Sequence, residues 1–176
     1  MRPDLKGRTE RYAEVAAEYG PALERLARGY ERDSDKRRDL LQDIHIALWR
    51  SLARFDGRCS LRTWVYRVAH NVATSHVIRA KQHAPLLDAT EDIESIPDST
   101  DGEGMLDRRR ALARLYELIR KLRPIDRQVM LLYLEELDAT TIAEVTGLSA
   151  GNVATKIHRI KQALARRFHH KGVVHE

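Results

Sequence analysis

An acidic segment at residues 84–107 constrains the fold of this chain more than any other feature. It reads APLLDATEDIESIPDSTDGEGMLD, with eight acidic residues, no Lys or Arg, two prolines and two glycines. Pro and Gly interrupt regular structure, and the segment lacks sustained helical spacing, so it is typical of a linker. The sequence therefore predicts two small domains, 1–83 and 108–176, joined by a linker that either aids solubility or screens basic surfaces.

The first unit shows apolar residues at helical spacing in three segments. One helix carries Tyr12, Val15 and Tyr19, and the Gly20-Pro21 pair breaks or kinks it. A second helix starts at Ser34 and Asp35 and buries a stripe of four residues: Leu41, Ile44, Leu48 and Leu52. The turn FDGRCS precedes a third helix, with Ser60 as its N-cap and an apolar stripe of five residues: Leu61, Trp64, Val65, Val68 and Val72.

The second unit combines four helical segments, the last two separated by a glycine turn. The first helix spans about 112–122 and ends before Pro124, and the second spans about 125–134. Thr140 or Thr141 caps a short third helix, Gly147 stops it with a positive φ, and Ser149 caps a long fourth helix. Because no segment alternates with period two, both units are predicted to be all-α, and the second contains a helix-turn-helix.

The long last helix has two ordered faces. Its apolar stripe, which must pack on the rest of the domain, consists of Val153, Ile157, Ile160 and Leu164. Its polar and basic face carries Asn152, Thr155, Lys156 and Arg159, with Lys161 prolonging the positive charge and Ser149 at the start. Asn and Arg can bond base edges in the major groove, so this face predicts duplex binding, although any surface helix has a polar side.

Composition excludes several classes of protein. Cys59 is the single cysteine, no run of about 18 apolar residues exists, and the N-terminus lacks the apolar core of a secretory signal. We find no nucleophile with a base, no phosphate-binding loop, and no His and Cys at zinc-finger spacing. The sequence therefore predicts a cytoplasmic protein that is not an enzyme and needs no cofactor, metal or small-molecule substrate.

Both units resemble parts of bacterial RNA polymerase sigma factors. The segment RRDLLQDIHIALWRSLARFDGRCSLRTWVYRVAHNVATSHVIRAK is similar to sigma region 2, and LRPIDRQVMLLYLEELDATTIAEVTGLSAGNVATKIHRIKQAL is similar to region 4. Two such regions joined by a short linker resemble the extracytoplasmic-function group. The resemblance implies a protein that binds core RNA polymerase and recognises the minus-ten and minus-thirty-five promoter elements.

The resemblance also implies roles for individual residues. The acidic and amide face of the second helix, which would bind the polymerase beta-prime clamp, consists of Asp39, Gln42 and Asp43. Residues 54–61 correspond to the loop that receives a base flipped out of the minus-ten element. The residues expected to bind this single strand are Arg58, Arg62, Arg67, Asn71, Arg79 and Lys81. The expected minus-thirty-five contacts are Ser149, Asn152, Thr155, Lys156, Arg159 and Lys161.

The sequence departs from the family pattern at Ser75, Leu61 and Ala154, so the promoter sequence does not follow from it. Trp64 lies on an apolar stripe and is expected to pack in the core. Trp49 and Tyr66 lie off the stripes and could either contact DNA or be buried.

Two functions remain open at this point. The first is a sigma factor whose partners are core polymerase, through the beta-prime clamp and the beta flap, promoter DNA, and an anti-sigma factor that could hold it at the membrane. The alternative is a stand-alone helix-turn-helix repressor or activator, which would bind duplex DNA tightly by itself as a symmetric dimer.

Overall fold

The structure is a computed structural model that describes residues 5–83 and 103–170, and these residues form α-helices with no strand. The all-α prediction is confirmed. The elements in chain order are α1 Leu5–Tyr30, α2 Ser34–Ser51, the short 3-10 helix η1 Leu52–Arg54, α3 Leu61–His83, α4 Glu103–Arg120, α5 Pro124–Leu134, α6 Ala139–Thr146 and α7 Ala150–His170.

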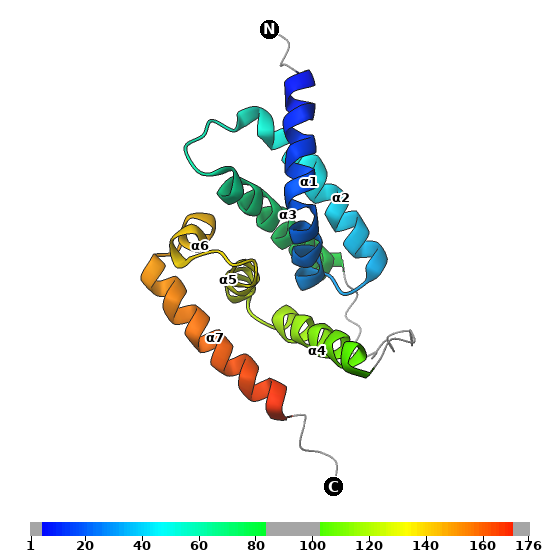
Figure 1. Ribbon diagram of the computed structural model, residues 1–176, viewed down its shortest axis with the longest axis vertical. Helices are drawn as coiled ribbons and strands as arrows, with labels where there is room; N and C mark the ends of the chain where they lie inside the picture. Colours follow the sequence, from blue (N-terminus) through cyan, green and yellow to red (C-terminus); the bar gives the residue numbers. More distant parts are fainter. Residues whose placement is uncertain (1–4, 84–102, 171–176) are drawn as a thin grey trace.

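Helices α1, α2 and α3 lie side by side and form the first unit (Figure 1). Their shared core is mostly apolar, with Leu23 and Leu26 from α1, Ile44 and Leu48 from α2, and Val65 from α3. Burying one such side chain stabilises the fold by roughly 1.5–3 kcal/mol, so the three helices depend on one another for stability.

Of the two outcomes predicted for Gly20-Pro21, a break or a kink, the break does not occur, because α1 runs from Leu5 to Tyr30 with Pro21 inside it. A proline inside a helix costs about 3 kcal/mol, because it removes a backbone donor and crowds the preceding turn. Pro21 itself is exposed, and buried residues lie on both sides of it, including Tyr19 and Leu23. Continuous burial along one face of α1 therefore outweighs the local cost of the proline.

Helix α2 begins at Ser34 as predicted, and of its predicted buried stripe only Leu41 is wrong, by one residue. Asp33 is the N-cap, since its carboxylate accepts hydrogen bonds from the backbone N–H groups of Asp35 and Lys36. Leu40 is fully buried whereas Leu41 is half-buried. An Asp accepts these helix-start bonds as well as a Ser does, and neighbouring leucines leave the stripe ambiguous by one position.

Helices α4 to α7 form the second unit, and its helix-turn-helix is confirmed. Asp138 caps α6 through a 2.7 Å hydrogen bond from the Thr141 N–H, so neither Thr140 nor Thr141 is the cap. Gly147 ends α6 with a φ of 77°, a left-handed conformation that glycine adopts without steric cost. Ser149 Oγ then accepts a hydrogen bond from the Asn152 N–H at the start of α7.

Helix α4 begins at Glu103, so the last five residues assigned to the linker are helical. The rest of the predicted linker lies outside the described residues.

The two units pack against each other. Figure 1 shows α5 and α6 beside α3, and α4 beside the end of α1. Helices α1 and α5 meet at Gly29, where an added Cβ would lie 2.7 Å from Leu131 Cδ1. Leu131 is buried there, so the absence of a side chain at Gly29 allows these helices to touch.

Candidate nucleic-acid interface

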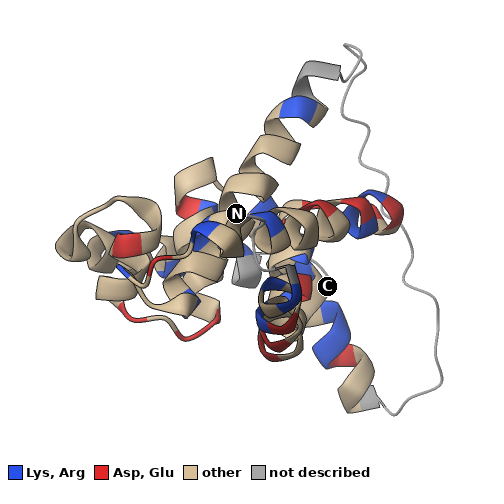
Figure 2. Cartoon of the chain, turned by 90° about the horizontal axis from the view of Figure 1, so that it is seen from above, with Lys and Arg blue, Asp and Glu red and all other residues tan. Residues whose placement is uncertain are grey.

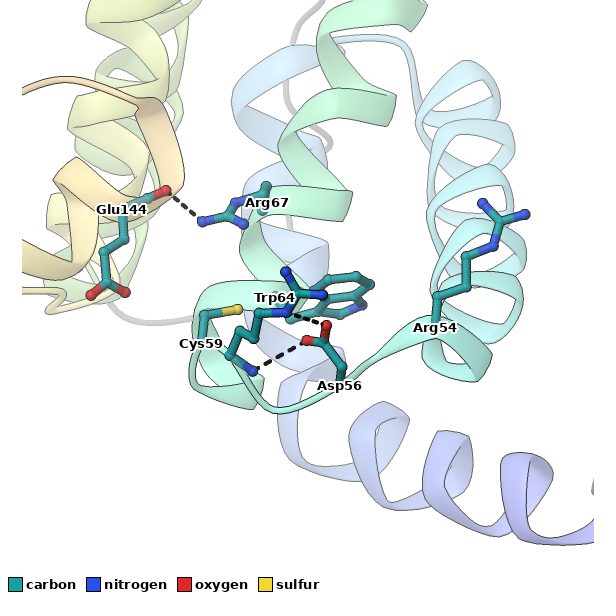
Figure 3. Close-up of a pocket in the computed structure, with 7 residues that line it drawn as sticks. Arg54, Asp56, Cys59, Trp64, Arg67 and Glu144 are labelled. Carbon is teal, nitrogen blue, oxygen red and sulfur yellow. Dashed lines mark hydrogen bonds and ion pairs between the residues drawn. The ribbon is translucent and has the colours of Figure 1, made fainter.

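A polar pocket lies where the loop before α3 meets α6 (Figure 3). Its volume is about 530 Å³, within the range of roughly 300–1,000 Å³ that is usual for small-ligand sites. The lining residues are Arg54, Asp56, Arg58, Cys59, Trp64, Arg67 and Glu144. All but Glu144 belong to the first unit, so the pocket is a basic site of that unit with one carboxylate contributed by the second.

Local hydrogen bonds hold the loop that forms this pocket. Gly57 has a φ of 77°, and the carboxylate of Asp56 accepts bonds from the backbone N–H and the Nε of Arg58. Ser60 Oγ accepts the Thr63 N–H at 3.0 Å, which confirms Ser60 as the N-cap of α3.

The ring of Trp64 forms one wall of the pocket. It meets Phe55 edge to face at 5.5 Å, and its Nε1 donates to Ser51 Oγ. Such a ring is held in place and only half-buried, so it offers a fixed apolar surface beside the arginines.

The arginines predicted to bind the minus-ten strand occupy three different environments. Arg58 is exposed and paired with Asp56 within the loop. Arg62 donates to the backbone oxygen of Glu135, and Arg67 donates to that of Glu144, both at 2.7 Å. Thus the structure brings Arg58 and Arg67 to the pocket, while Arg62 and Arg67 both contact the second unit.

The other predicted minus-ten residues lie along α3. Asn71 is exposed one turn after Arg67, and Arg79 lies 3.8 Å from Asp43 near the end of the helix. The side chain of Lys81 lies outside the described residues.

Tyr66 is part of the core and is not a base-stacking surface, because only 2% of it is exposed. Its ring packs edge to face with Tyr19, and burial raises the pKa of its hydroxyl to about 12. Trp49 is half-buried, and the guanidinium of Arg8 covers its ring at 3.6 Å from the centroid. Tyr66 is therefore unavailable to a base, and one face of the Trp49 ring is occupied by Arg8.

Three of the predicted minus-thirty-five residues form an exposed row on α7: Asn152, Thr155 and Arg159. They lie opposite the buried stripe of Val153, Ile160 and Leu164, which confirms the two-faced helix. A row at this spacing near the start of a recognition helix is where base edges are reached. Ser149 lies just before the helix and serves as its cap.

The two predicted lysine contacts are engaged with α5. Lys156 is half-buried, and its Nζ lies 2.8 Å from the carboxylate of Asp126. Burial opposes ionisation of Asp126, but hydrogen bonds and charge from Lys156 and Arg123 outweigh it and hold the pKa of Asp126 below its usual value. Lys161 points to Tyr133, donating to its hydroxyl at 3.3 Å.

The face of α2 predicted to bind polymerase is open. Asp39, Gln42 and Asp43 are all exposed, on the side opposite the buried leucines. The structure adds Ile46, which is 40% exposed one turn after Gln42. Sequence reasoning missed this apolar residue, although an Ile off the buried stripe and beside three polar residues was a usable signal.

A buried histidine is a feature of the first unit with no direct role at the pocket. His70 is 1% exposed, and its Nδ1 shares a 2.8 Å hydrogen bond with the Tyr30 hydroxyl. Burial lowers the pKa of His70 to about 3, so the ring is neutral.

Acidic and basic residues are spread over several helices of both units (Figure 2). Among the described residues, no group of His, Cys, Asp and Glu could hold a metal ion, and none of the helices is long and apolar enough to span a membrane.

The fold defines an all-α protein with a helix-turn-helix unit and a second helical unit that carries a basic pocket, and comparisons with known proteins identify its family. Residues 15–83 match the family Sigma-70 region 2, and residues 112–164 match Sigma-70, region 4. The chain is 28% identical to the RNA polymerase sigma-H factor of Pseudomonas aeruginosa over 77% of this chain and 74% of that protein. It is 26% identical to the ECF RNA polymerase sigma factor SigW of Bacillus subtilis over 92% of this chain and 91% of SigW.

A solved structure shares the fold. The sigma factor RpoE from Bartonella quintana, in complex with the anti-sigma factor NepR, superposes with a TM-score of 0.67 at 16% identity, covering 89% of this chain and 96% of that one. The chain belongs to the sigma-70 family, in its extracytoplasmic-function group.

Proposed function

We propose that this protein is an alternative sigma factor that binds core RNA polymerase and directs it to promoters with a minus-thirty-five and a minus-ten element. The observation that carries the proposal is the exposed row of Asn152, Thr155 and Arg159 on a capped recognition helix, in a chain whose other unit holds a basic pocket. One site suits a duplex and the other suits an unpaired base, which is the combination that promoter opening requires.

At the minus-thirty-five element, α7 lies in the major groove. An Asn side chain can bond adenine through two hydrogen bonds, and Arg can bond guanine in the same way. Asn152 and Arg159 are the residues assigned to these contacts, and Ser149 lies near a backbone phosphate. Lys156 acts through its ion pair with Asp126, which holds α7 against α5.

At the minus-ten element, the pocket receives one flipped base. Extrusion of a base costs a few kcal/mol, which stacking on Trp64 and charge from Arg58 and Arg67 offset. Asn71 reads an edge of the base or its neighbour, while Arg62, Arg79 and Lys81 neutralise the strand. The protein supplies recognition and strand separation, and the polymerase supplies the chemistry.

The polymerase contact is the exposed face of α2. Asp39, Gln42 and Asp43 complement a basic helix of the beta-prime clamp, and Ile46 adds apolar area to this face. The second unit binds the beta flap. The protein acts in the cytoplasm, where polymerase and the chromosome are. An anti-sigma factor, which could be anchored in the membrane, holds the protein inactive until it is needed.

Transcription by purified bacterial core polymerase on a library of random promoters tests the proposal. With the protein present, we expect new transcripts whose upstream sequences share two spaced elements, and without it none of these. Polymerase-independent, tight binding of the protein to a palindromic duplex, with no new transcripts, would contradict it.

A further inference from the structure

Ile78 on α3 is an exposed apolar side chain on the helix that carries the residues assigned to the minus-ten element. It is 52% exposed, whereas the other large apolar residues of α3 are buried or half-buried. The exposed residues closest to it along the described part of α3 are Ser75, Arg79 and Ala80, so this helix forms no larger apolar patch there for a protein partner. A single exposed Ile is common on protein surfaces, so the meaning of Ile78 depends on its position.

That position is on a row of outward side chains along α3. Arg67, Asn71 and Ile78 are separated by four and seven residues, and at 3.6 residues per turn their directions around the helix agree within about 40°. Arg67 lines the pocket and Asn71 is exposed, so the row begins at the site proposed for the flipped base. A rise of 1.5 Å per residue puts Ile78 roughly 10 Å beyond Asn71, which corresponds to about three base pairs of duplex.

The polar side chains around Ile78 have partners within the protein. The three pairs are Ser75 with the backbone oxygen of Asn71 at 2.9 Å, His76 with Glu31 at 3.1 Å and Arg79 with Asp43 at 3.8 Å. A DNA-binding helix reads sequence with the side chains that it points at the base edges. At this level of α3 the outward side chain on the row is Ile78, so what the helix offers to a base there is apolar.

One base suits an apolar side chain better than the others. Thymine alone carries a methyl group at its major-groove edge, and apolar side chains contact that group. Contact of Ile78 with the methyl group removes apolar surface of both partners from water. Any other base at this position places a polar edge against the Ile side chain, which cannot replace the hydrogen bonds that the edge makes with water.

We propose that Ile78 is a specificity-determining residue, which selects a thymine about three base pairs from the position read by Asn71, on the side away from the pocket. The contact is made to the methyl group, so it reads sequence without a hydrogen bond. This inference rests on the proposed function, because it needs the minus-ten element to lie along α3.

Deoxyuridine provides the test, because it pairs as thymine does but lacks the methyl group. A promoter obtained from the random library is prepared with each thymine of its minus-ten region replaced in turn by deoxyuridine, on either strand. Transcription by core polymerase with the full-length protein is then measured on each template. We expect about a fourfold loss at the thymine that meets Ile78, since burial of one methyl group is worth roughly that factor.

Ile78→Ala identifies the residue responsible for the loss. It removes the side chain that meets the methyl group, so thymine and deoxyuridine templates should give equal rates at that one position. Ser75→Ala is the matched control one turn earlier, because the Ser75 hydroxyl bonds to the helix backbone. In this control the loss on the deoxyuridine template should persist.

Ile78→Gln gives an independent measurement. A Gln side chain bonds adenine through two hydrogen bonds, which would change the preferred base. Repeating the library selection with this variant should therefore replace thymine by adenine at one position of the minus-ten region, with the other positions unchanged.

The outcomes separate this inference from the proposed function. Protein-dependent transcription with equal rates on thymine and deoxyuridine templates at every position, or from a promoter with no thymine in the region, would overturn the role of Ile78 alone. The same holds if Ile78→Ala lowers transcription from both templates by one factor, since that is the effect of a structural residue. Absence of protein-dependent transcripts from every template would instead overturn the proposed function, and this inference with it.

Discussion

The two surfaces proposed to bind DNA differ in which parts of the chain hold them in place. The row of Asn152, Thr155 and Arg159 on α7 is open, and it owes its position to packing within one unit. Arg62 and Arg67 on α3 instead donate hydrogen bonds to backbone oxygens of the second unit, while Arg62 stays exposed and Arg67 lines the pocket. The position of the first surface therefore depends on one unit alone, whereas the arginines of the second surface are positioned by both units.

The largest expected effect is on transcription, and it comes from a change on the exposed face of α7. Arg159→Ala should lower protein-dependent transcription about 10- to 100-fold, because one bidentate base contact is worth roughly 1–3 kcal/mol. Lys161→Ala is the matched control, since it removes the same charge two residues later, about 200° around the helix. We expect a much smaller loss for it, because Lys161 is directed to Tyr133. Similar losses for both variants would mean that charge, and not base contact, is what α7 contributes.

The sequence was sufficient for the open surface because every rule that creates it is local. Ser149 caps α7, Gly147 permits the turn, and Val153 begins the buried stripe, all within a few residues of one another. The same local reasoning placed Ser60 at the start of α3.

The contacts between the two units could not be predicted from such local rules. The contacts of Glu135 with Arg25, and of Glu144 with Arg67, join residues 110 and 77 positions apart in the chain. No spacing or composition marks either acid as a partner of those arginines. The choice between a break and a continuous helix at Pro21 could not be made locally for a related reason, since burial by α2 and α3 overrides a local signal. Lys156, likewise, has the sequence signature of a DNA contact but the surroundings of a structural ion pair.

A substitution that changes no charge should weaken the contact between the two units. Gly29→Ala introduces a methyl group into the side chain of Leu131, which destabilises the contact of α1 with α5 by about 1–3 kcal/mol. Each 1.4 kcal/mol enlarges tenfold the fraction of molecules in which this contact is open, so free-protein affinity for single-stranded DNA should rise while duplex binding by α7 stays unchanged.

Gly29→Ala combined with Leu131→Ala relieves the overlap and serves as the control. The double variant should bind single strands less tightly than Gly29→Ala alone. A Gly29→Ala protein whose single-strand affinity equals that of the wild type would show that Leu131 adapts at no cost, and that the helices are not held by close packing.

The smallest expected effect is on the pH dependence of stability. It arises from a buried histidine in the first unit and a buried aspartate in the second. In the first unit, His70 is neutral with a pKa of about 3, whereas an unfolded histidine has a pKa of about 6.5. Protons therefore bind the unfolded chain first, so the stability linked to His70 is complete above about pH 6.5 and is lost as the pH falls toward 3. In the second unit, the pKa of Asp126 is lowered instead, so its contribution persists until the pH falls below the usual range of an aspartate.

Mild acid should thus weaken the first unit before the second. We expect the free energy of unfolding to fall by about 1.4 kcal/mol between pH 7.5 and pH 5.5 through His70 alone, measured by urea titration at both values. His70→Asn keeps a polar atom near Tyr30 but cannot take up a proton, so its stability should change less over the same interval. Equal pH dependence in the two proteins would mean that His70 gains a proton without unfolding, and that its surroundings admit water.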